Sequence, residues 1–265
     1  MAPLPGVATR GYARPMPTLS IETIPCLRDN YAYLIADVTA GDAWLVDPSE
    51  PGPPSAVLRR RNLRLRGILA THHHMDHVGG IATLVDQHRD VWVAGHARDQ
   101  GRIPRQTIFI DAPPEHFMVT DLNLGGQGLL AMYIPGHTLG AIAWYLPPAR
   151  GAAGGDVFTG DTLFAAGCGR LFEGSPTQMH NSLQSLVALA PETRLWFGHE
   201  YTAANLRFAA AIEPDNAEVQ ARAADLPICT TPTTVALELA TNPFVRAASA
   251  EVLAERRLAK DEFRG

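Results

Sequence analysis

The chain has 265 residues, enough for one large domain or for a domain with a smaller appendage. Its hydrophobic fraction of 46% and its charged fraction of 18% predict a substantial core and argue against general disorder. The net charge of -5 gives no reason to expect nucleic-acid binding, and no apolar run reaches the length of a membrane span.

The cysteines and the first residues bear on the compartment. The chain has three cysteines, Cys26, Cys168 and Cys229, an odd and sparse set that argues against a disulfide framework. A reducing compartment fits such a set best, so we expect a cytoplasmic protein, and a monomer without nucleic-acid or membrane partners. Residues 1–18 lack the apolar core of a signal peptide and predict a disordered leader, with a transit peptide as the alternative.

Short apolar and aromatic runs bounded by turn residues predict the strands of the first half. They lie at 19–24, 31–35, 43–46, 68–70 and 91–94. The turn-like triplet at 28–30 joins the first two. Residues 51–54 are rich in helix breakers and predict a loop, whereas 55–61 and the segment from 81 to near His88 predict helices.

The middle of the chain alternates short strands with turns. The expected strands lie at 129–134, 141–146, 157–159 and 195–197. Three of them run into a glycine, Gly136, Gly160 or Gly198, that directly precedes a histidine or an aspartate. Because glycine lets the backbone turn sharply and approach a site closely, these positions are candidates for one common site.

From about residue 200 the pattern becomes helical. Helices are predicted at 203–211, 216–224, 234–240 and 248–258. Asp215 and Thr233 are the expected N-cap residues of the second and third of these. The chain therefore divides into a leader, a strand-rich part at 19–199 and a small helical domain at 200–265.

A dense histidine cluster follows the strand at 68–70. Four histidines and one aspartate fall between His72 and His77. On an extended segment His72 and His74 point the same way, which suits two imidazoles on one metal ion, while Asp76 and His77 can face a second ion. Several imidazoles this close together are characteristic of metal sites. His73 should point away from its neighbours and take a structural or outer role.

Seven candidate ligands follow when the residues after the glycines are added to the cluster. Seven groups are too many for one tetrahedral ion and suit two. We expect three histidines to hold the first ion, namely His72, His74 and His137. The second ion is expected on Asp76, His77 and His199, and Asp161 is expected to bridge the two ions.

These motifs resemble those of the metallo-β-lactamase superfamily, and more closely those of glyoxalase II, the hydroxyacylglutathione hydrolases. The matching segments are THHHMDH at 71–77, PGHT at 135–138, TGDTLF at 159–164, GCGR at 167–170, GHEY at 198–201, NPFVR at 242–246 and KDEF at 260–263. The first motif specifies only the superfamily, whereas those near the C-terminus point to glyoxalase II.

The resemblance implies an α/β fold, an αββα sandwich followed by the helical domain, which helps to bind glutathione. The residues it implies for that role are Arg170, Phe172, Tyr201, Arg257 and Lys260. Arg170 stands where the family has a lysine, and Phe172, which has no hydroxyl, where it has a tyrosine. Lys260 is the only lysine among 22 basic residues and falls at the expected position.

The resemblance also implies the activity, a binuclear-metal thioester hydrolysis. The expected substrate is an S-(2-hydroxyacyl)glutathione such as S-D-lactoylglutathione, an intermediate of methylglyoxal detoxification. The expected cofactors are two divalent ions, with zinc first and iron or manganese as alternatives. Asp76 and Asp161 are the expected catalytic residues, and Cys168 is expected to be structural.

Other members of the superfamily give the competing hypotheses. A persulfide dioxygenase would use one iron and a reduced ligand set, which the seven candidates argue against. A β-lactamase or a nuclease does not predict the C-terminal motifs. A non-catalytic metal-binding homologue predicts a missing ligand, and all seven positions are filled.

Overall fold

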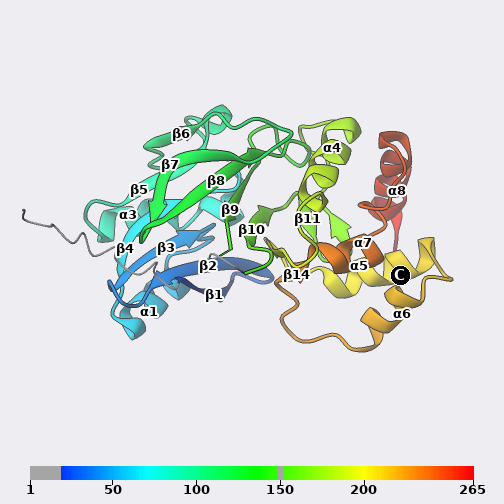
Figure 1. Cartoon of the computed structure of the whole chain (residues 1–265), viewed down its shortest axis with the longest axis horizontal. Helices are drawn as coiled ribbons and strands as arrows, with labels where there is room; N and C mark the ends of the chain where they lie inside the picture. The colour runs from blue at the N-terminus through cyan, green and yellow to red at the C-terminus, as the bar shows by residue number, and fades with distance from the viewer. Residues whose placement is uncertain (1–18, 149–151) are drawn as a thin grey trace, which may run out of the picture.

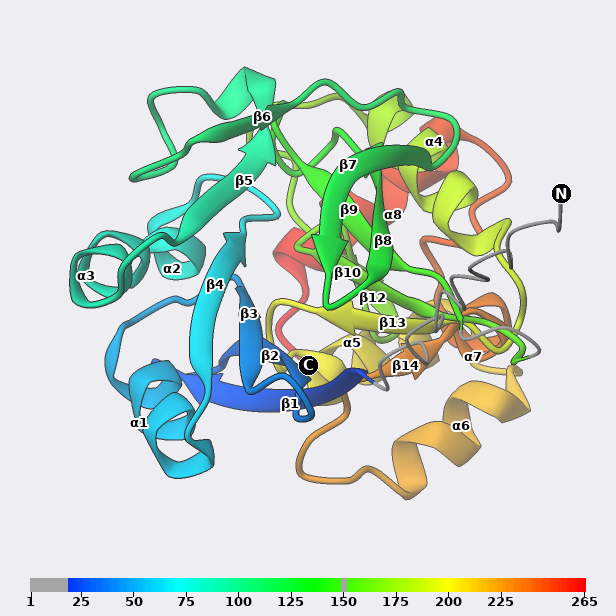
Figure 2. The same ribbon diagram turned by 60° about the vertical axis from the view of Figure 1, so that its left-hand side comes forward.

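Two six-stranded sheets pack face to face in the computed structural model, which describes residues 19–148 and 152–265 (Figures 1 and 2). The predicted leader at 1–18 lies outside these residues. The first sheet has the order β1-β2-β3-β4-β5-β6. Its strands are β1 Leu19–Cys26, β2 Asn30–Asp37, β3 Asp42–Val46, β4 Arg64–Leu69, β5 Trp92–His96 and β6 Ile108–Ile110. Pairing is antiparallel from β1 to β3 and parallel from β3 to β6.

The second sheet has the order β14-β13-β10-β9-β8-β7. It consists of β7 Met118–Leu124, β8 Gln127–Tyr133, β9 Ile142–Leu146, β10 Asp156–Gly160, β13 Arg194–Phe197 and β14 Thr233–Thr234. A small hairpin, β11 Leu163–Phe164 with β12 Gly167–Cys168, follows β10. Because β14 comes from the helical part, that part contributes a strand to the edge of the sheet.

Strand β2 shows why the sheets are layered between helices. All eight of its residues are buried, so the strand has no solvent face. Tyr33 and Ile35 belong to the cluster between the two sheets, whereas Leu34 belongs to the cluster under the outer helices. Alternate side chains of a strand point to opposite faces, so each face of this sheet buries its own core.

Helices cover the outer face of each sheet, which makes the sandwich αββα. The first sheet is covered by α1 Gly52–Arg61 and α3 Ile81–Gln87, and the short α2 Met75–Val78 precedes α3. The second is covered by α4 Pro176–Val187. A short 3₁₀ turn, Ala97–Asp99, follows β5. None of the helices in the described ranges is long and apolar enough to cross a membrane.

Helix α4 was not expected from the sequence, although its signals are present. Ser175 and Gln178 form a capping box, and a proline occupies the first turn. Met179 and Leu183 lie on one face and are fully buried. These residues lie between the motifs GCGR at 167–170 and GHEY at 198–201.

Several predicted boundaries differ from the observed ones, and three of the differences have a clear local cause. Helix α1 begins at Gly52, inside the predicted loop, because prolines are tolerated in the first turn of a helix. The N-cap of α6 is Asn216 rather than Asp215, since the Asn216 side chain accepts the amides of the first turn. The N-cap of α7 is likewise Thr234 rather than Thr233.

The helical part gathers at one end of the sandwich, on the right of Figure 1. It contains α5 Thr202–Ile212, α6 Ala217–Ala224, α7 Val235–Thr241 and α8 Ala250–Glu262. The buried Glu238 carboxylate of α7 accepts hydrogen bonds from the Ala166 amide (2.8 Å), Arg222 (2.9 Å) and Asn242 (2.8 Å). Asn242 also donates to the Gly167 carbonyl oxygen (2.9 Å). This buried polar joint fastens the helices to the β11–β12 hairpin.

Candidate active site

The seven candidate ligands meet at one edge of the sandwich. They come from the segment after β4 and from the turns after β8, β10 and β13, strand ends that lie far apart in sequence. Ligand atoms converge in two groups, each within 4.8 Å: His72, His74 and His137, and Asp76, His77 and His199. Asp161 lies between the groups. The structure therefore brings together every residue that the sequence proposed for a metal centre.

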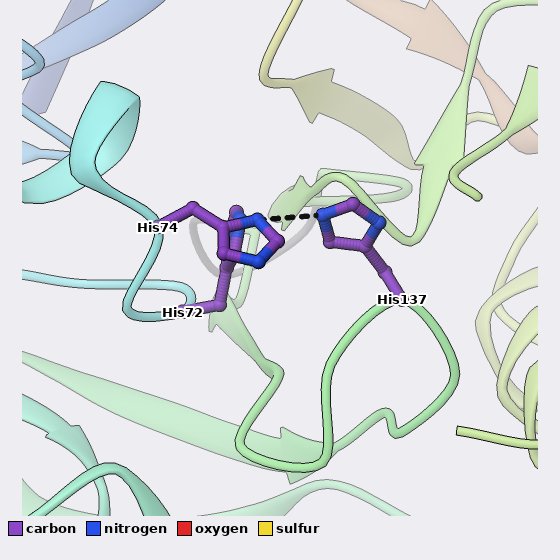
Figure 3. Close-up of side chains that lie close together, drawn as sticks. All are labelled: His72, His74 and His137. Atoms are coloured by element: carbon purple, nitrogen blue, oxygen red, sulfur yellow. Dashed lines mark hydrogen bonds between the residues drawn. The ribbon is translucent and has the colours of Figure 1, made fainter. Parts of the chain in front are cut away.

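The first group is a triangle of ring nitrogens (Figure 3). His74 Nδ1 lies 3.1 Å from His72 Nε2 and 3.0 Å from His137 Nε2. The other nitrogens of His72 and His137 face Thr71 Oγ1 (3.1 Å) and the Arg170 carbonyl oxygen (2.9 Å). Because the Arg170 carbonyl oxygen can only accept, His137 Nδ1 carries a proton, and a neutral His137 presents an unprotonated Nε2 to the triangle. The spacing of the triangle is close to the edge of about 3.3 Å in a tetrahedron with Zn–N bonds near 2.0 Å.

The second group contains two histidines, and the Nδ1 atom of each is hydrogen-bonded to a carboxylate. His77 Nε2 and His199 Nε2 are 3.3 Å apart, and Asp76 Oδ2 is 3.3 Å from the latter. His77 Nδ1 donates to Asp47 (2.9 Å), and His199 Nδ1 donates to Asp29 (2.9 Å). Carboxylates in this position fix the ring and leave Nε2 free to bind a cation, as in many zinc sites.

Asp161 connects the two groups. One of its oxygens, Oδ1, lies 3.2 Å from His77 Nε2, and the other lies 3.3 Å from His199 Nε2 and 3.5 Å from His137 Nε2. Oδ1 is buried and has no hydrogen-bond partner among the described residues. Without a proton on His77 Nε2 this buried oxygen faces a lone pair, which a bound cation would relieve, so the donor set fits two divalent ions.

The two groups differ in electrostatics. Burial and neighbouring histidines lower the pKa of His74 to about 4 and depress the pKa of His72 and of His137. In the second group burial also lowers the pKa of His199, but Asp161 outweighs it and raises that pKa to about 10. The pKa of His77 is raised for the same reason. The first group is thus built of neutral imidazoles, and the second is built of imidazoles facing carboxylates.

Two of the predicted glycines are required by the site. A Cβ atom on Gly198 would lie 2.3 Å from Asp161 Oδ1. Gly160 has a φ of +51°, and a Cβ there would lie 2.3 Å from Thr71 Oγ1. A larger residue at either position would push the loops apart and displace Asp161.

Asp47 and Asp29 are functional residues that the sequence reasoning missed. Asp47 accepts the Thr71 amide (2.7 Å) and the Thr71 hydroxyl (2.5 Å) in addition to His77. It follows β3, which pairs in parallel with β4, and β4 leads into the histidine cluster. Because parallel strands end at the same edge, the position of Asp47 after a strand was the signal that could have found it.

A cleft of about 570 Å³ extends from the metal groups to the helical part. Its lining includes residues of both groups and all five residues that the resemblance implies for glutathione, namely Arg170, Phe172, Tyr201, Arg257 and Lys260. The structure therefore places the proposed chemistry and the proposed substrate contacts in one continuous space.

Arg257 is committed to contacts within the protein. Only 8% of it is exposed, and its guanidinium donates to the Cys168 carbonyl oxygen (2.8 Å) and to Asp261 Oδ1 (3.0 Å). The same Asp261 oxygen lies 3.2 Å from Arg170 Nε. Arg257 and Asp261 thus hold the loop after β12 against helix α8.

Lys260 keeps most of its hydrogen-bonding capacity. Its Nζ donates to the Ala204 carbonyl oxygen (2.7 Å), which leaves two of its three donors. Burial, together with the charges of Arg257 and Arg207, lowers its pKa to about 8. A negatively charged ligand would be attracted to this ammonium group and would stabilise its charged form.

Two aromatic rings border the metal end of the cleft. Tyr201 stacks on His199 with centroids 4.8 Å apart and an interplanar angle of 7°. Phe172 contacts His74 and His137 edge-on, at centroid distances of 5.6 and 5.3 Å, and is 63% exposed. Both rings line the same cleft as the basic residues.

Comparison with known protein families gives two adjoining matches. A metallo-β-lactamase superfamily model matches residues 27–199, and a model of the hydroxyacylglutathione hydrolase C-terminus matches residues 200–263. The hydroxyacylglutathione hydrolase of a Synechococcus strain is 42% identical, over 92% of this chain and 100% of the relative. That of Thermosynechococcus vestitus is 45% identical, over 86% of this chain and 88% of the relative.

Solved structures have the same fold. ETHE1 from Myxococcus xanthus matches with a TM-score of 0.66 and 23% identity over 92% of each chain, a likeness of fold alone. TTHA1623, solved in a di-iron-bound form, matches with a TM-score of 0.55 and 30% identity over 83% of this chain and 98% of that one.

Proposed function

The chain belongs to the hydroxyacylglutathione hydrolases of the metallo-β-lactamase superfamily, and we propose that it hydrolyses S-(2-hydroxyacyl)glutathione to a 2-hydroxy acid and glutathione. The observation that carries the proposal is the single cleft lined by the metal groups at one end and by Lys260 at the other. The match of residues 200–263 to the C-terminal family model favours this activity over β-lactamase, nuclease or persulfide dioxygenase activity.

We propose that two divalent ions are held by the residues expected from the sequence. His72, His74 and His137 would hold one, Asp76, His77 and His199 the other, and Asp161 would contact both. Nitrogen and oxygen donors of this kind suit zinc, iron and manganese, and we favour zinc. The di-iron form of TTHA1623 supports a two-ion centre in this fold. Bound ions would polarise the thioester carbonyl and lower the pKa of water.

The protein's own contribution to the reaction is to hold and orient. Asp47 and Asp29 fix the rings of His77 and His199, so the ligand atoms need little rearrangement during the reaction. The Asp76 side chain is 45% exposed in the cleft, and its carboxylate can orient the attacking water. Cys168 is buried, which raises its thiol pKa to about 11, so it is not a nucleophile.

The end of the cleft that is lined by Arg170 and Lys260, called the basic end, would recognise glutathione. We assign Lys260 and the exposed Arg170 to the carboxylates of the peptide, because both retain donors that face the cleft. Arg257 acts through the loop that it holds, since its guanidinium is already bonded to Cys168 and Asp261. Phe172 would pack against the substrate without a hydrogen bond.

The physiological substrate we propose is S-D-lactoylglutathione, which places the protein in methylglyoxal detoxification. All three cysteines are free, which supports a reducing compartment such as the cytoplasm. The test is hydrolysis of S-D-lactoylglutathione by the zinc-loaded protein, measured as release of free thiol. We expect saturable release that is lost in Asp161→Asn. Absence of thiol release from the loaded wild-type protein would reject the function.

A further inference from the structure

A charged cluster outside the cleft links the two segments that supply the first metal group. Its hub is Glu173, in the loop that leads to α4. One carboxylate oxygen, Oε2, accepts the backbone amide of Leu139 (2.8 Å), and the other accepts Arg102 Nη2 (2.6 Å). The Glu173 backbone amide also donates to the His137 carbonyl oxygen (3.4 Å). Glu173 therefore holds the turn that carries His137 through both its main chain and its side chain.

Arg102 extends the cluster to the other segment. Its guanidinium contacts Nε2 of His73, which stands between His72 and His74 in the sequence. Glu173 Oε1 lies 3.7 Å from the same His73 nitrogen. The cluster thus reaches the backbone on both sides of the triangle in Figure 3, where His72 and His74 come from one segment and His137 from another.

Asp99 contacts the same two segments through its buried carboxylate. Its carboxylate is fully buried, with Oδ1 at 3.0 Å from His73 Nδ1 and 3.6 Å from Arg102 Nη1. It also packs against the turn that carries His137, because a Cβ atom on Gly140 would lie 2.1 Å from Asp99 Oδ1. The two ring nitrogens of His73 therefore lie beside Asp99 and Arg102, within ion-pair distance of the first and in contact with the second.

We propose that Glu173 is a positioning residue for the first metal group, acting through the Leu139 amide and through Arg102 and His73. The inference rests on the proposed two-ion centre, and it assigns to this chain's Glu173 and Arg102 a part in setting the distance between His137 and the pair His72 and His74. The second group has its own supports in Asp47 and Asp29, so the effect of Glu173 should be confined to the first.

The experiment tests whether the loss of Glu173 weakens zinc binding at the first group alone. The probe is Zn²⁺ alone, measured by competition with a chromogenic chelator. His199→Ala removes one proposed zinc ligand from the second group, and His137→Ala removes one from the first. We expect Glu173→Ala to weaken zinc binding by about tenfold or more in the His199→Ala background, the loss typical of removing a residue that orients a ligand, and by less than about twofold in the His137→Ala background. Equal losses in the two backgrounds, or none in either, would overturn the proposal.

Further variants separate positioning from folding. Asp86→Ala removes a comparable ion pair, with Arg105 at 2.9 Å, that lies apart from the site, and it should leave zinc affinity unchanged. Arg102→Ala should act like Glu173→Ala, and the double variant should lose less than the sum of the two. The zinc-free Glu173→Ala protein should unfold at the wild-type temperature, and a large drop would reassign Glu173 to folding. A wild-type chain that bound no zinc would reject the metal centre itself, and the positioning role with it.

Discussion

The two ends of the cleft are built in opposite ways. At the metal end the histidines of the second group are buried, and each has its second ring nitrogen bonded to a carboxylate. At the basic end the Arg170 side chain is 63% exposed, and it has one ion pair, with Asp261, among the described residues. The first end is fixed by neighbours before any ligand arrives, and the second is left with donors to spare.

The difference indicates which end of the cleft stabilises the transition state and which end binds substrate and transition state alike. Groups fixed in advance favour the transition state, because they need not reorganise as charge develops. Exposed, flexible side chains bind substrate and transition state about equally, which changes KM more than kcat. Substitutions at the metal end should therefore act on kcat and those at the basic end on KM.

The largest effect is expected from Asp161→Ala. The substitution removes the carboxylate between the two groups, and the loss of several kcal/mol of transition-state stabilisation corresponds to about a thousandfold in kcat/KM. Steady-state thiol release from zinc-loaded protein, with metal content determined on the same sample, measures it. A variant with wild-type kcat would contradict the expectation that substitutions at the metal end lower kcat.

Lys260→Met should raise KM by roughly tenfold to a hundredfold with little change in kcat, since a hydrogen bond to a charged group contributes about 1.5–3 kcal/mol. Methionine keeps the apolar stem that packs near Phe208. Lys260→Arg is the matched control and should retain most of the affinity. A fall in kcat with KM unchanged would place Lys260 with the metal end instead.

The pH dependence of KM should show the same division. Lys260 has a pKa lowered to about 8, so its positive charge is fully present below that pH and is lost above it. KM should therefore rise as the pH increases through about 8 and beyond, with the bound anion moving the midpoint upward. Lys260→Arg should flatten the rise, because arginine stays charged. A rise that persists in Lys260→Arg would assign it to another group.

The smallest effect is expected from Phe172→Tyr. The new hydroxyl would reach into an exposed part of the cleft, where one added hydrogen bond is worth about 0.5–1.5 kcal/mol, so KM should fall by about threefold. The Tm should not change, because the ring is largely exposed. An increase in KM would show that the apolar ring packs against the substrate better than a hydroxyl binds it.

The sequence predicted much of this site because its residues sit in local patterns. The ligands of both groups follow strand ends, and three of the strands lead into a glycine, so spacing alone marked them. Asp47 also follows a strand end, but no glycine precedes it, and its role depends on which strands are neighbours in the sheet. Glu173 and Arg102 are separated by 71 residues and meet only in the fold. Helix α4, which begins three residues after Glu173, was missed as well.

The strands missed by the sequence reasoning are short or irregular. Strand β6 has three residues, and β11, β12 and β14 have two each, too few for an alternating pattern to appear. β7 alternates buried and exposed residues, yet it contains Asp121 and Asn123, which are uncommon in strands. Its pairing with β8 stabilises it regardless of propensity.

The stacked pair of His199 and Tyr201 has a consequence for how such proteins descend from one another. The two family matches meet between residues 199 and 200, so one ring belongs to each side of the joint. A recombination event at that point would place a foreign residue beside His199. The buried Glu238 would likewise lose its partner at Ala166. Exchange of the C-terminal segment would therefore alter the ring beside His199 and the support of the β11–β12 hairpin in one step.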